Sequence, residues 1–485
     1  MAALVVIRGA GLTAGDVRAV ARDGAPVAVA DTARERAARA WRTVTEVARH
    51  QAVYGRGTGV GANRDVDVTA IGDGEHGLRL LRSHAAGAGP LLDAARTRAM
   101  LVVRLNQLAA GGSGVAPGLL PTLADVLNEG LLPPVHSLGG IGTGDLTALA
   151  STALCLLGER PWRDHQHVPH YPMHAGDALA FISSNAATVG EACLGMEDLR
   201  DLLDASVTVA ALAFHAVDGS PEPYAEAVHA ARPHQGQRAV AARMRELVAG
   251  VDAVAPRVQD PYSYRAIPQV HGPAVDACAN LDRTLAIELN AACENPLVDV
   301  AGQTVWHNGN FHGAYLGLAL DTMRAAIFST AALSAARLST LVEPRYTGLR
   351  PFLADGPPAS SGIMILEYVS QSALAELRHH AGATGLATAV VSRGLEEHAA
   401  FSAQAARNLT EVVDSYRVVL CCELVAAVRA LRMRGTQPAP GPVRDAYDLA
   451  AAELDARTGD RPLDADLAVA AGLLAALGRP ADARL

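Results

Sequence analysis

The residues with the most distinctive chemical potential form a glycine-rich stretch, HSLGGIGTGDLTALAS, which spans 136–151. Its glycines permit backbone conformations that are closed to other residues. Asp145 suits the first turn of a helix, where exposed backbone N–H groups favour an acidic side chain. The pattern predicts a tight loop that runs into a buried helix, as a structural turn or an anion-binding loop. It differs from the Walker loop, because no Gly-Lys-Ser/Thr sequence follows the glycines.

Three other segments carry side chains suited to acid–base or anion chemistry. Tyr54, in VYGRGTGVG, can remove a proton as a phenolate if positive neighbours or hydrogen bonds lower its ordinary pKa of about 10. Arg265, in VQDPYSYRAIPQVHG, carries a planar fork that binds a carboxylate through two hydrogen bonds. Glu396, in SRGLEEHAAFS, can accept a hydrogen bond from a ring N–H. Each residue alone also fits an ordinary role, as a loop anchor, a helix-capping turn or a solvated helix face.

Mainly helical elements are expected to position these residues. Half of the 485 residues are hydrophobic but only 4% are aromatic, so alanine, leucine and valine must supply most of the packing. Alanine and leucine favour helix, because they lose little freedom in it. The run LVVIRG near the N-terminus predicts a strand. The spacing of apolar residues predicts helices over 93–110, 118–129, 145–157, 196–217, 273–292, 313–342, 362–380 and 402–434.

Three consecutive parts organise the chain in this interpretation. Residues 1–195 form an N-terminal lobe of mixed structure that carries the tyrosine loop and the glycine-rich loop. Residues 196–436 form a bundle, because long helices that are apolar on more than one face must pack against several neighbours, here also across subunits. The Pro/Gly-rich GTQPAPGP then introduces a linker and a short helical tail over 437–485.

Composition and charge argue against several classes of partner and compartment. The net charge is −9, the pI is near 6, and the basic residues form no cluster, so no nucleic acid is expected. The six cysteines form no C-x-x-C pair and mostly lie in apolar helical stretches, where cysteine acts as a small hydrophobe. His and Cys residues show no metal-ligand spacing, so no metal is expected. Without a signal-peptide pattern or an uninterrupted apolar span, the sequence predicts a cytoplasmic protein with no membrane partner.

Together these segments resemble the histidine/phenylalanine ammonia-lyase family. That family carries Ala-Ser-Gly-Asp-Leu at such a loop, and its Ala-Ser-Gly cyclises and dehydrates into an electrophile, 4-methylidene-imidazole-5-one (MIO). This chain has Gly142-Thr143-Gly144 before Asp145-Leu146. The final Gly-Asp-Leu is therefore shared, but two of the three cofactor-forming residues differ.

The two exchanged residues decide what the loop can become. In ring closure, the nitrogen of the third residue attacks the carbonyl of the first, and both Gly142 and Gly144 retain those groups. Dehydration of Thr143 would leave an ethylidene in place of a methylidene, with a methyl group on the carbon that must be attacked. Either an MIO-like ethylidene variant forms from the three residues, or no cofactor forms and Thr143 remains an ordinary side chain.

The resemblance also implies roles for residues outside this loop. Tyr54 falls on the catalytic base of the family. Ser83-His84, in RSHAAGAG, falls on the pair that lines the substrate ring pocket in the histidine-preferring branch. Glu396 falls on the acidic residue that faces the imidazole in histidine enzymes. The resemblance further implies substrate binding for Gln259 and Arg265 and a catalytic role for Tyr262.

Support of the cofactor loop is implied for three more residues. HNGNFHG, over 307–313, resembles the family's Gly-Gly-Asn-Phe-His segment, which implies a place for Asn310 and Phe311 beside the loop. The family's Gly-Leu-Ala-Leu-Ile-Asn-Gly segment resembles DALAFISSNAA, in which the site asparagine becomes Ser183. Asn185 lies two residues on and can take over its hydrogen bond.

The resemblance implies a mainly α fold, with a long central helical bundle of the ammonia-lyase/fumarase-like type and a mixed N-terminal lobe. It also implies a homotetramer with shared active sites. The implied reaction removes ammonia from a small-molecule aromatic amino acid, with L-histidine or an analogue favoured, to give an α,β-unsaturated acid. An aminomutase, which adds the ammonia back at the β-carbon, is one alternative. Another is a family member without the usual cofactor, with altered chemistry or a binding or scaffold role.

Overall fold

The structure is a computed structural model of the chain, and it describes residues 3–69, 74–163, 170–174, 176–251 and 256–478. The chain falls into two compact units, each built from separated segments. The first unit combines Met1–Glu197, Leu281–Leu320 and Ala383–Arg407. The second combines Asp198–Asn280, Asp321–Gly382 and Asn408–Leu485.

These units follow a different division from the three consecutive parts expected from the sequence. The boundary at Glu197 lies near the expected boundary at 195, but two later segments return to the first unit. Both reach the glycine-rich loop, because Gly313 N–H donates to the Gly142 carbonyl and Phe401 N–H donates to the Ile141 carbonyl. Contacts between segments distant in sequence define the unit, and periodicity along the chain does not reveal such contacts.

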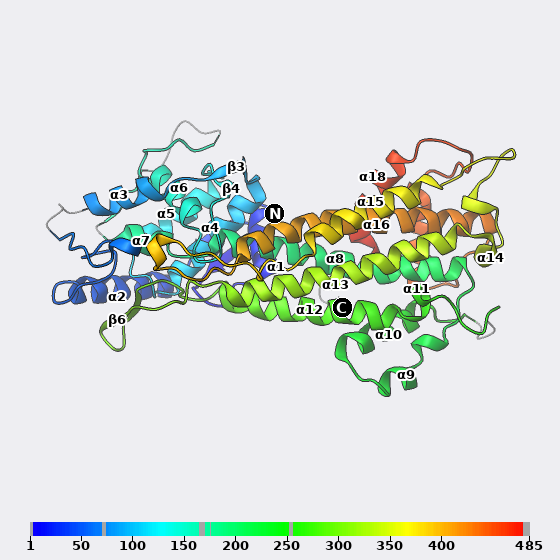
Figure 1. The fold of residues 1–485 in the computed structure, drawn as a ribbon, viewed down its shortest axis with the longest axis horizontal. Helices are drawn as coiled ribbons and strands as arrows, with labels where there is room; N and C mark the ends of the chain where they lie inside the picture. The colour runs from blue at the N-terminus through cyan, green and yellow to red at the C-terminus, as the bar shows by residue number, and fades with distance from the viewer. Residues whose placement is uncertain (1–2, 70–73, 164–169, 175, 252–255, 479–485) are drawn as a thin grey trace. The chain divides into compact units, whose positions relative to one another are not determined.

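The first unit combines short strand pairs with helices of moderate length (Figure 1). One strand pair is parallel, β1 (Val5–Ile7) with β2 (Val27–Val29). Two pairs are antiparallel, β3 (Ala88–Leu91) with β4 (His136–Leu138) and β5 (Leu297–Asp299) with β6 (Thr304–Trp306). The α-helices lying wholly in this unit are α1 (Ala14–Ala21), α2 (Asp31–Val47), α3 (Glu75–His84), α4 (Ala94–Ala109), α5 (Leu119–Asn128), α6 (Leu146–Leu156) and α7 (Asp177–Ile182).

Helix α4 is the buried centre of the first unit. Nearly all of its residues after the first turn are inaccessible to solvent, including polar ones. Asn106 on this helix is paired, since its Oδ1 accepts a hydrogen bond from Gly9 N–H over 2.9 Å. Gly190 allows a close approach to α4, because a Cβ there would lie only 2.8 Å from the carbonyl carbon of Ala99.

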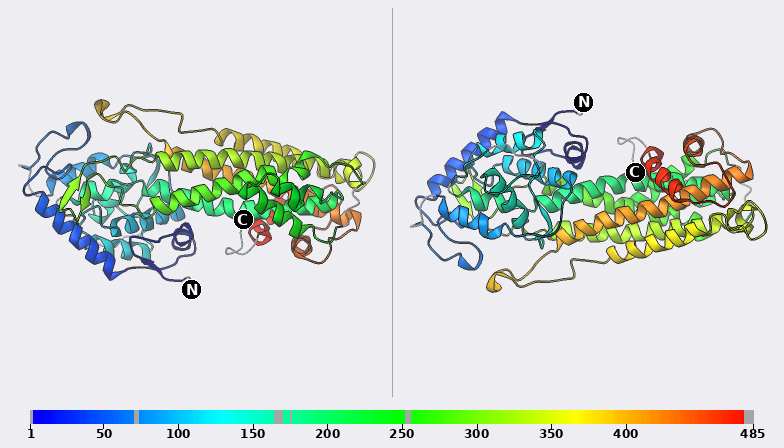
Figure 2. Two further views of the ribbon diagram at one scale, coloured as in Figure 1. Left: turned by 90° about the horizontal axis from the view of Figure 1, so that it is seen from below. Right: turned by 90° about the horizontal axis from the view of Figure 1, so that it is seen from above.

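Long helices dominate the second unit, where they run side by side as a bundle (Figures 1 and 2). They are α8 (Ala186–Ala216), α12 (Ile267–Glu288), α13 (Ala314–Leu341), α15 (Ile365–His380) and α16 (Ser402–Arg434), and all of them except α15 have one end within the first unit. Shorter helices complete the unit, namely α9 (Glu226–Ala230), α10 (Gln235–Leu247), α11 (Tyr262–Arg265), α14 (Pro344–Thr347), α17 (Pro442–Glu453) and α18 (Asp464–Leu477). Small apolar side chains, mostly alanine, leucine and valine, fill its core. The mainly α fold with a long-helix bundle is therefore confirmed.

Most of the expected helices are confirmed, but two begin earlier than expected. The helices expected at 93–110, 118–129, 145–157, 313–342 and 402–434 match α4, α5, α6, α13 and α16 to within one residue at each end. Helix α8 begins at Ala186 and not near 196, because Gly190, which weakens the helical signal, packs closely against α4. Helix α12 begins at Ile267 and contains Pro273, which had been taken as its start because proline is favoured in a first turn.

Helix α13 bears on the expectation about membranes. Among the described residues it is long and apolar enough to cross a bilayer by length and composition, but Asp321, Arg324 and Arg337 interrupt it, so it is not an uninterrupted apolar span. In addition, 56% of its apolar window is buried inside the protein. Arg324 and Arg337 on the same helix are also buried and ion-paired, with Asp321 and Glu423. Helix α13 is therefore a core helix of the bundle.

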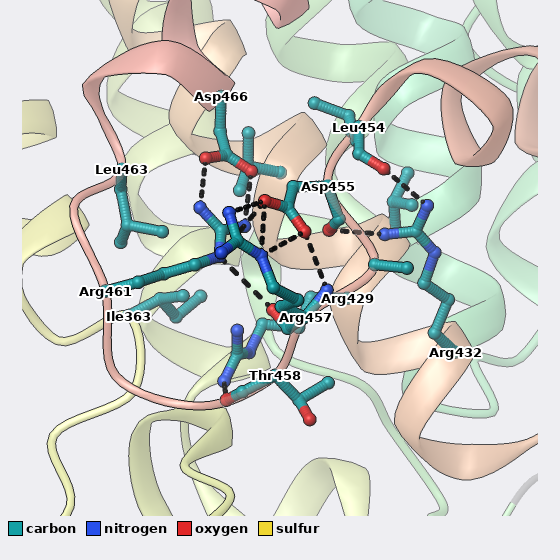
Figure 3. Close-up of a pocket in the computed structure, with 13 residues that line it drawn as sticks. Ile363, Arg429, Arg432, Leu454, Asp455, Arg457, Thr458, Arg461, Leu463 and Asp466 are labelled. Carbon is teal, nitrogen blue, oxygen red and sulfur yellow. Dashed lines mark hydrogen bonds and ion pairs between the residues drawn. The ribbon is translucent and has the colours of Figure 1, made fainter.

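A cluster of paired charges fixes the C-terminal segment in the second unit, and we name it the tail clamp (Figure 3). Its members are Arg429, Arg432, Asp455, Arg457, Arg461 and Asp466. Arg461 holds the Asp466 carboxylate with two nitrogens, one of them at 2.7 Å. Arg432, on α16, donates to the Asp455 carbonyl over 2.9 Å. The segment that leads from α17 to α18 is therefore attached to α16 by arginines.

Candidate active site

The glycine-rich loop connects β4 to α6 and is held through its backbone. Gly142 and Gly144 have φ angles of +89° and +114°, in the region that glycine alone adopts without strain. The Gly142 carbonyl accepts a hydrogen bond from Gly313 N–H over 2.9 Å. The Gly144 N–H donates to Asn185 Oδ1 over 2.9 Å. The two groups that flank Thr143 therefore each have a fixed partner.

Asp145 follows the loop and is fully buried at the start of α6. Its carboxylate caps a different helix, because Thr188 in the first turn of α8 donates to it with its backbone N–H over 2.8 Å and its hydroxyl over 3.0 Å. Burial raises the pKa of Asp145, and the hydrogen bonds from Thr188 oppose that rise. The acidic residue expected in a first turn thus joins the loop to the start of α8.

Asn185 bridges the loop to a second segment of the unit. Besides accepting from Gly144, it donates from Nδ2 to the Phe311 carbonyl over 2.6 Å. Ser183, which aligns directly with the family's asparagine, instead accepts from Asn295 N–H over 3.3 Å. Of these two residues, Asn185 is the one in contact with the glycine-rich loop.

Arg104 fixes the backbone that presents Asn185. Its guanidinium donates to the Phe181 carbonyl over 2.9 Å and to the Glu294 carboxylate over 3.0 Å. Both side chains of this ion pair are buried. Breaking a buried pair by removing one partner costs about 3–5 kcal/mol, so this contact holds the end of α7 firmly.

Gly142 also packs against the start of α16. A Cβ at this position would lie 2.9 Å from the backbone nitrogens of Phe401 and Ser402 and from Ser402 Oγ. Phe401 has a φ of +49°, a conformation that costs a residue with a side chain about 1–2 kcal/mol. The close approach of the Phe401–Ser402 backbone therefore explains why glycine stands here in place of the family's alanine.

A pocket of about 660 Å³ opens beside the loop, within the first unit. Its volume lies in the range typical of small-molecule sites. Two of its lining residues, Tyr54 and Glu396, were expected in the site as base and ring acceptor, and Phe311 was expected beside the cofactor loop. The full lining is Ala52, Tyr54, Thr58, Arg64, Asp65, Asn295, His307, Phe311, Leu395 and Glu396.

Tyr54 stands half-buried in the wall of this pocket. Its hydroxyl accepts a hydrogen bond from Gly61 N–H over 2.7 Å, and its ring meets the His307 ring edge to face at 6.5 Å. Burial raises the pKa of Tyr54, and the charge of Glu396 adds to that rise. The Gly61 hydrogen bond and the Arg64 charge lower the pKa. The neutral phenol is therefore favoured in this unit by itself, and a phenolate needs further positive groups.

Glu396 and Thr143 face one another across 3.5 Å, with the hydroxyl donating to the carboxylate. A tight turn presents Glu396, since its N–H donates to the Val391 carbonyl over 3.3 Å. Within that turn Ser392 and Arg393 have φ angles of +52° and +57°, which are strained for residues with side chains. Strain of this kind gathers at functional sites, where surrounding contacts hold it in place.

Ser83 and His84 end α3, and neither lines the pocket. Ser83 Oγ donates to the Leu80 carbonyl over 2.9 Å. His84 Nδ1 lies 2.9 Å from the same carbonyl and 3.0 Å from Ser83 Oγ. These two side chains bond to each other and to their own helix, so the structure does not bring them to the pocket.

Asn310 and Phe311 lie in one turn but differ in what they contact. Phe311 lines the pocket and offers its carbonyl to Asn185. Asn310 is exposed, and its backbone N–H donates to Asn308 Oδ1 over 2.8 Å. Of the two, only Phe311 lines this pocket.

Gln259, Tyr262 and Arg265 belong to the second unit. The Tyr262 side chain is 70% exposed, and the Arg265 guanidinium stacks over its ring at 4.1 Å. Arg265 Nε is buried and has no hydrogen-bond partner within the described part of the chain. The guanidinium therefore stacks on Tyr262 and keeps one buried donor, Nε, without a partner among the described residues.

Several pocket residues escaped the sequence analysis. His307 fell within the matched segment HNGNFHG but was not singled out, and Asn295 was not considered. Arg64 and Asp65 follow the tyrosine loop directly and carried no signal of their own, since an Arg-Asp pair is a common solvated surface feature. Proximity in the fold identifies these residues, and the spacing of residue types alone does not.

The loop residues fit a backbone-derived ring. The nitrogen of Gly144 and the carbonyl of Gly142 are the groups that closure must join, and each is held from outside by a hydrogen bond. Gly142 has no Cβ that would hinder the approach of the Gly144 nitrogen to its carbonyl carbon. Among the described residues, no group of three or more His, Cys, Asp or Glu side chains could hold a metal ion.

The chain matches the aromatic amino acid lyase family over residues 12–452. It is 36% identical over 505 residues to the probable histidine ammonia-lyase of Halobacterium salinarum. This alignment covers 97% of this chain and 96% of that protein. The histidine ammonia-lyase of Trypanosoma cruzi has a similar structure, with a TM-score of 0.90, 27% identity and coverage of 98% and 93% of the two chains. The tyrosine aminomutase of Streptomyces globisporus is also similar, with a TM-score of 0.90, 29% identity and coverage of 98% and 97%.

Fold and site together define a carbon–nitrogen lyase. The chain belongs to the aromatic amino acid lyase family, with histidine ammonia-lyases among its relatives. Members of this family generally use the MIO group. The family resemblance drawn from the sequence is therefore confirmed.

Proposed function

We propose that this lyase eliminates ammonia from an aromatic amino acid whose ring carries an N–H donor, with L-histidine or a close analogue favoured. The product is an α,β-unsaturated acid. One observation carries the proposal. Tyr54 and Glu396, a base and a ring acceptor, line one pocket, and Glu396 also reaches Thr143 of the glycine-rich loop. We further propose that the enzyme acts in the cytoplasm on free amino acids.

Each of the chain's own groups has a defined task in this proposal. Tyr54 removes the β-proton, which it can do only as a phenolate. Glu396 accepts the ring N–H and thereby favours imidazole over a plain phenyl ring. Arg265 binds the carboxylate of the substrate, and its unpaired buried Nε supports that assignment. Tyr262 orients Arg265 by stacking against it.

The proposal includes closure of Gly142-Thr143-Gly144 into an MIO-like ring with an ethylidene group. When formed, such a ring supplies an electrophilic carbon that takes up the substrate amine and makes it a better leaving group. The hydrogen bond from Gly313 polarises the Gly142 carbonyl, and Asn185 orients the Gly144 nitrogen. These contacts support ring closure in this chain, although threonine replaces the usual serine.

The intact mass of the purified protein tests the ring. Closure and dehydration remove two water molecules from the chain, and we expect that deficit in the wild type. A Thr143→Val variant keeps the shape of the side chain but has no hydroxyl to lose, so it can lose at most one water. Absorbance of a urocanate-type product from L-histidine tests the reaction itself. Full mass together with no product would overturn the proposal.

A second copy of the chain completes the site in this proposal, within a homotetramer. Tyr262 is exposed, and large apolar side chains are exposed on both units, among them Tyr315 at 82%, Leu318 at 70% and Tyr368 at 66%. Exposed apolar groups of this size mark interaction surfaces when they cluster. The partner would supply Gln259, Tyr262 and Arg265 to the pocket that holds Tyr54.

Mixing two inactive variants tests the shared site. Tyr54→Phe and Arg265→Gln each remove one essential group from a different unit. If the groups of one site come from different subunits, assemblies reconstituted from both variants contain some intact sites and regain activity. If both groups come from one chain, the mixture stays inactive, while light scattering still reports the oligomeric state.

Two alternatives have specific support. The likeness to a tyrosine aminomutase favours a reaction in which ammonia returns to the β-carbon, and a β-amino acid among the products would identify it. The replacement of serine by Thr143 favours a member without the ring, which would bind the amino acid without removing ammonia. Full intact mass combined with measurable binding of L-histidine would identify that case.

A further inference from the structure

The hydroxyl of Ser402 has no role in the proposed elimination of ammonia. Ser402 is the first residue of α16 and is completely buried. Within the described part of the chain, its Oγ has no hydrogen-bond partner. A buried polar group without a partner costs about 1–3 kcal/mol, so such a group needs an explanation.

The Ser402 hydroxyl lies close to Gly142, which carries the reacting carbonyl, and to Gly313, whose N–H donates to that carbonyl. It is 2.9 Å from the point where a Cβ on Gly142 would stand, and 2.6 Å from the corresponding point on Gly313. The Gly142 oxygen lies 3.3 Å from that second point. Only the absence of side chains on both glycines leaves room for the hydroxyl so close to the loop.

The backbone next to Ser402 is held in an unfavourable conformation that maintains this contact. Phe401 has a φ of +49°, and its N–H donates to the Ile141 carbonyl over 2.8 Å. The start of α16 is therefore pinned to the residue that precedes Gly142. An observed outlier of this kind motivates a functional explanation.

We propose that Ser402 assists ring closure by donating its free hydroxyl to the Gly142 oxygen while the Gly144 nitrogen adds to that carbonyl. The inference rests on the proposed function, because it needs the loop to cyclise. It concerns the making of the electrophile, and it assigns Ser402 no contact with the substrate.

The step balances without an external reagent. The Gly144 nitrogen forms a bond to the Gly142 carbonyl carbon, and the electron pair of the C=O bond moves to the oxygen. The Gly144 proton passes to that oxygen, which then leaves as water together with the Thr143 amide proton. While the charge develops, Gly313 N–H and the Ser402 hydroxyl stabilise it as an oxyanion hole does.

Time-resolved intact mass after cell-free synthesis of the whole chain tests the inference. We expect Ser402→Ala to lose its first water at least about tenfold more slowly than the wild type, because loss of one oxyanion donor costs roughly a hundredfold in well-studied sites. We also expect its urea stability to be equal or higher, since the change removes an unpaired buried hydroxyl. A purely structural role predicts the opposite pattern, lower stability with unchanged closure.

Ser370→Ala is the matched control, because Ser370 on α15 is also buried with an unpaired hydroxyl but belongs to the second unit. Water loss in this control should match the wild type. Equal closure rates in Ser402→Ala and the wild type would overturn this inference and leave the proposed function intact. A wild type that never loses water would overturn both.

Discussion

The tail clamp and the active-site pocket are both rich in charged side chains, but they differ in how the charges are paired. In the tail clamp, arginines meet two carboxylates and several carbonyls, and only about 10 Å³ of free space remains (Figure 3). The pocket has a volume of about 660 Å³. Among the described residues, its Glu396 carboxylate accepts a hydrogen bond from the Thr143 hydroxyl at 3.5 Å, and Arg64 lies 3.7 Å from the Asp65 carboxylate.

The paired charges of the tail clamp therefore stabilise the fold, whereas the charges of the pocket remain available to a ligand. Arg461 and Asp466 satisfy each other with two short contacts and are largely buried. Arg64 keeps a side chain that is 48% exposed. We expect substitutions in the clamp to change stability, and substitutions in the pocket to change rates and substrate choice.

The largest expected effect is the loss of the base. Tyr54→Phe should lower kcat by about 10²–10⁴-fold, which is the usual contribution of a general base, and should change the free energy of unfolding little. Steady-state assay and urea denaturation check the two parts. Tyr346→Phe, at a tyrosine of the second unit that does not line the pocket, is the control and should keep full activity. Equal activity in both variants would remove Tyr54 from the mechanism.

The next effect belongs to the tail clamp. Asp466→Asn removes the carboxylate that Arg461 holds most closely, leaving Asp455 at 3.8 Å, and should cost about 3 kcal/mol of stability, with kcat unchanged for the folded enzyme. Urea unfolding curves measure the loss. Asp448→Asn breaks the exposed pair with Arg444 and should stay within about 1 kcal/mol of the wild type. A clamp variant as stable as this control would mean that the paired charges contribute nothing.

Substrate choice should change when Glu396 loses its charge. A hydrogen bond to a charged group contributes about 1.5–3 kcal/mol, so Glu396→Gln should reduce the preference for histidine over phenylalanine by roughly ten- to a hundredfold. The ratio of the two kcat/KM values is the measurement. Glu397→Gln changes the neighbouring acid, which does not line the pocket, and should leave the ratio unchanged. A constant ratio in both variants would contradict the role of ring acceptor.

A smaller effect is expected from restoring the family's alanine in the loop. Gly142→Ala adds a side chain at φ +89° and 2.9 Å from neighbouring backbone, so it should cost about 1–2 kcal/mol and slow the loss of water. Gly130→Ala tests the dihedral angle alone, because Gly130 has a φ of +72° with open space around it. Equal costs in the two variants would show that the contact with α16 is unimportant.

The smallest expected effect is a pH dependence of stability. Burial raises the pKa of Tyr54 in the folded protein above its ordinary value of about 10. Its contribution to stability is therefore fully present below pH 10 and is lost as the pH rises through the folded pKa. Tyr54→Phe should lose less stability than the wild type between neutral pH and strongly alkaline pH. Parallel unfolding curves for the two proteins would contradict this.

The sequence predicted the helices that end in clear signals. Two residues beyond the ends of helices α4, α5 and α6 lie Gly111, Gly130 and Gly158, all with positive φ, and the expected bounds of these helices were accurate. Prediction failed where tertiary contact outweighed local preference. The buried approach of Gly190 to α4 is an example, because it keeps α8 helical through glycines that normally weaken a helix.

The site was predictable only in part. Tyr54, Glu396 and Phe311 line one pocket, and Asn185 accepts a hydrogen bond from the glycine-rich loop, as expected. His84 does not reach the pocket, since its ring bonds to its own helix. The roles of Arg104 and Ser402 depend on buried partners, or on the lack of them, and neither property leaves a pattern in the order of residue types.

The segmented build of the first unit constrains when the protein can become active during its synthesis. The glycine-rich loop emerges from the ribosome early, but the backbone that binds it at Gly313 and Phe401 is made much later. The first unit cannot close until its last segment, Ala383–Arg407, has been translated. The loop therefore gains these two contacts only when most of the chain exists.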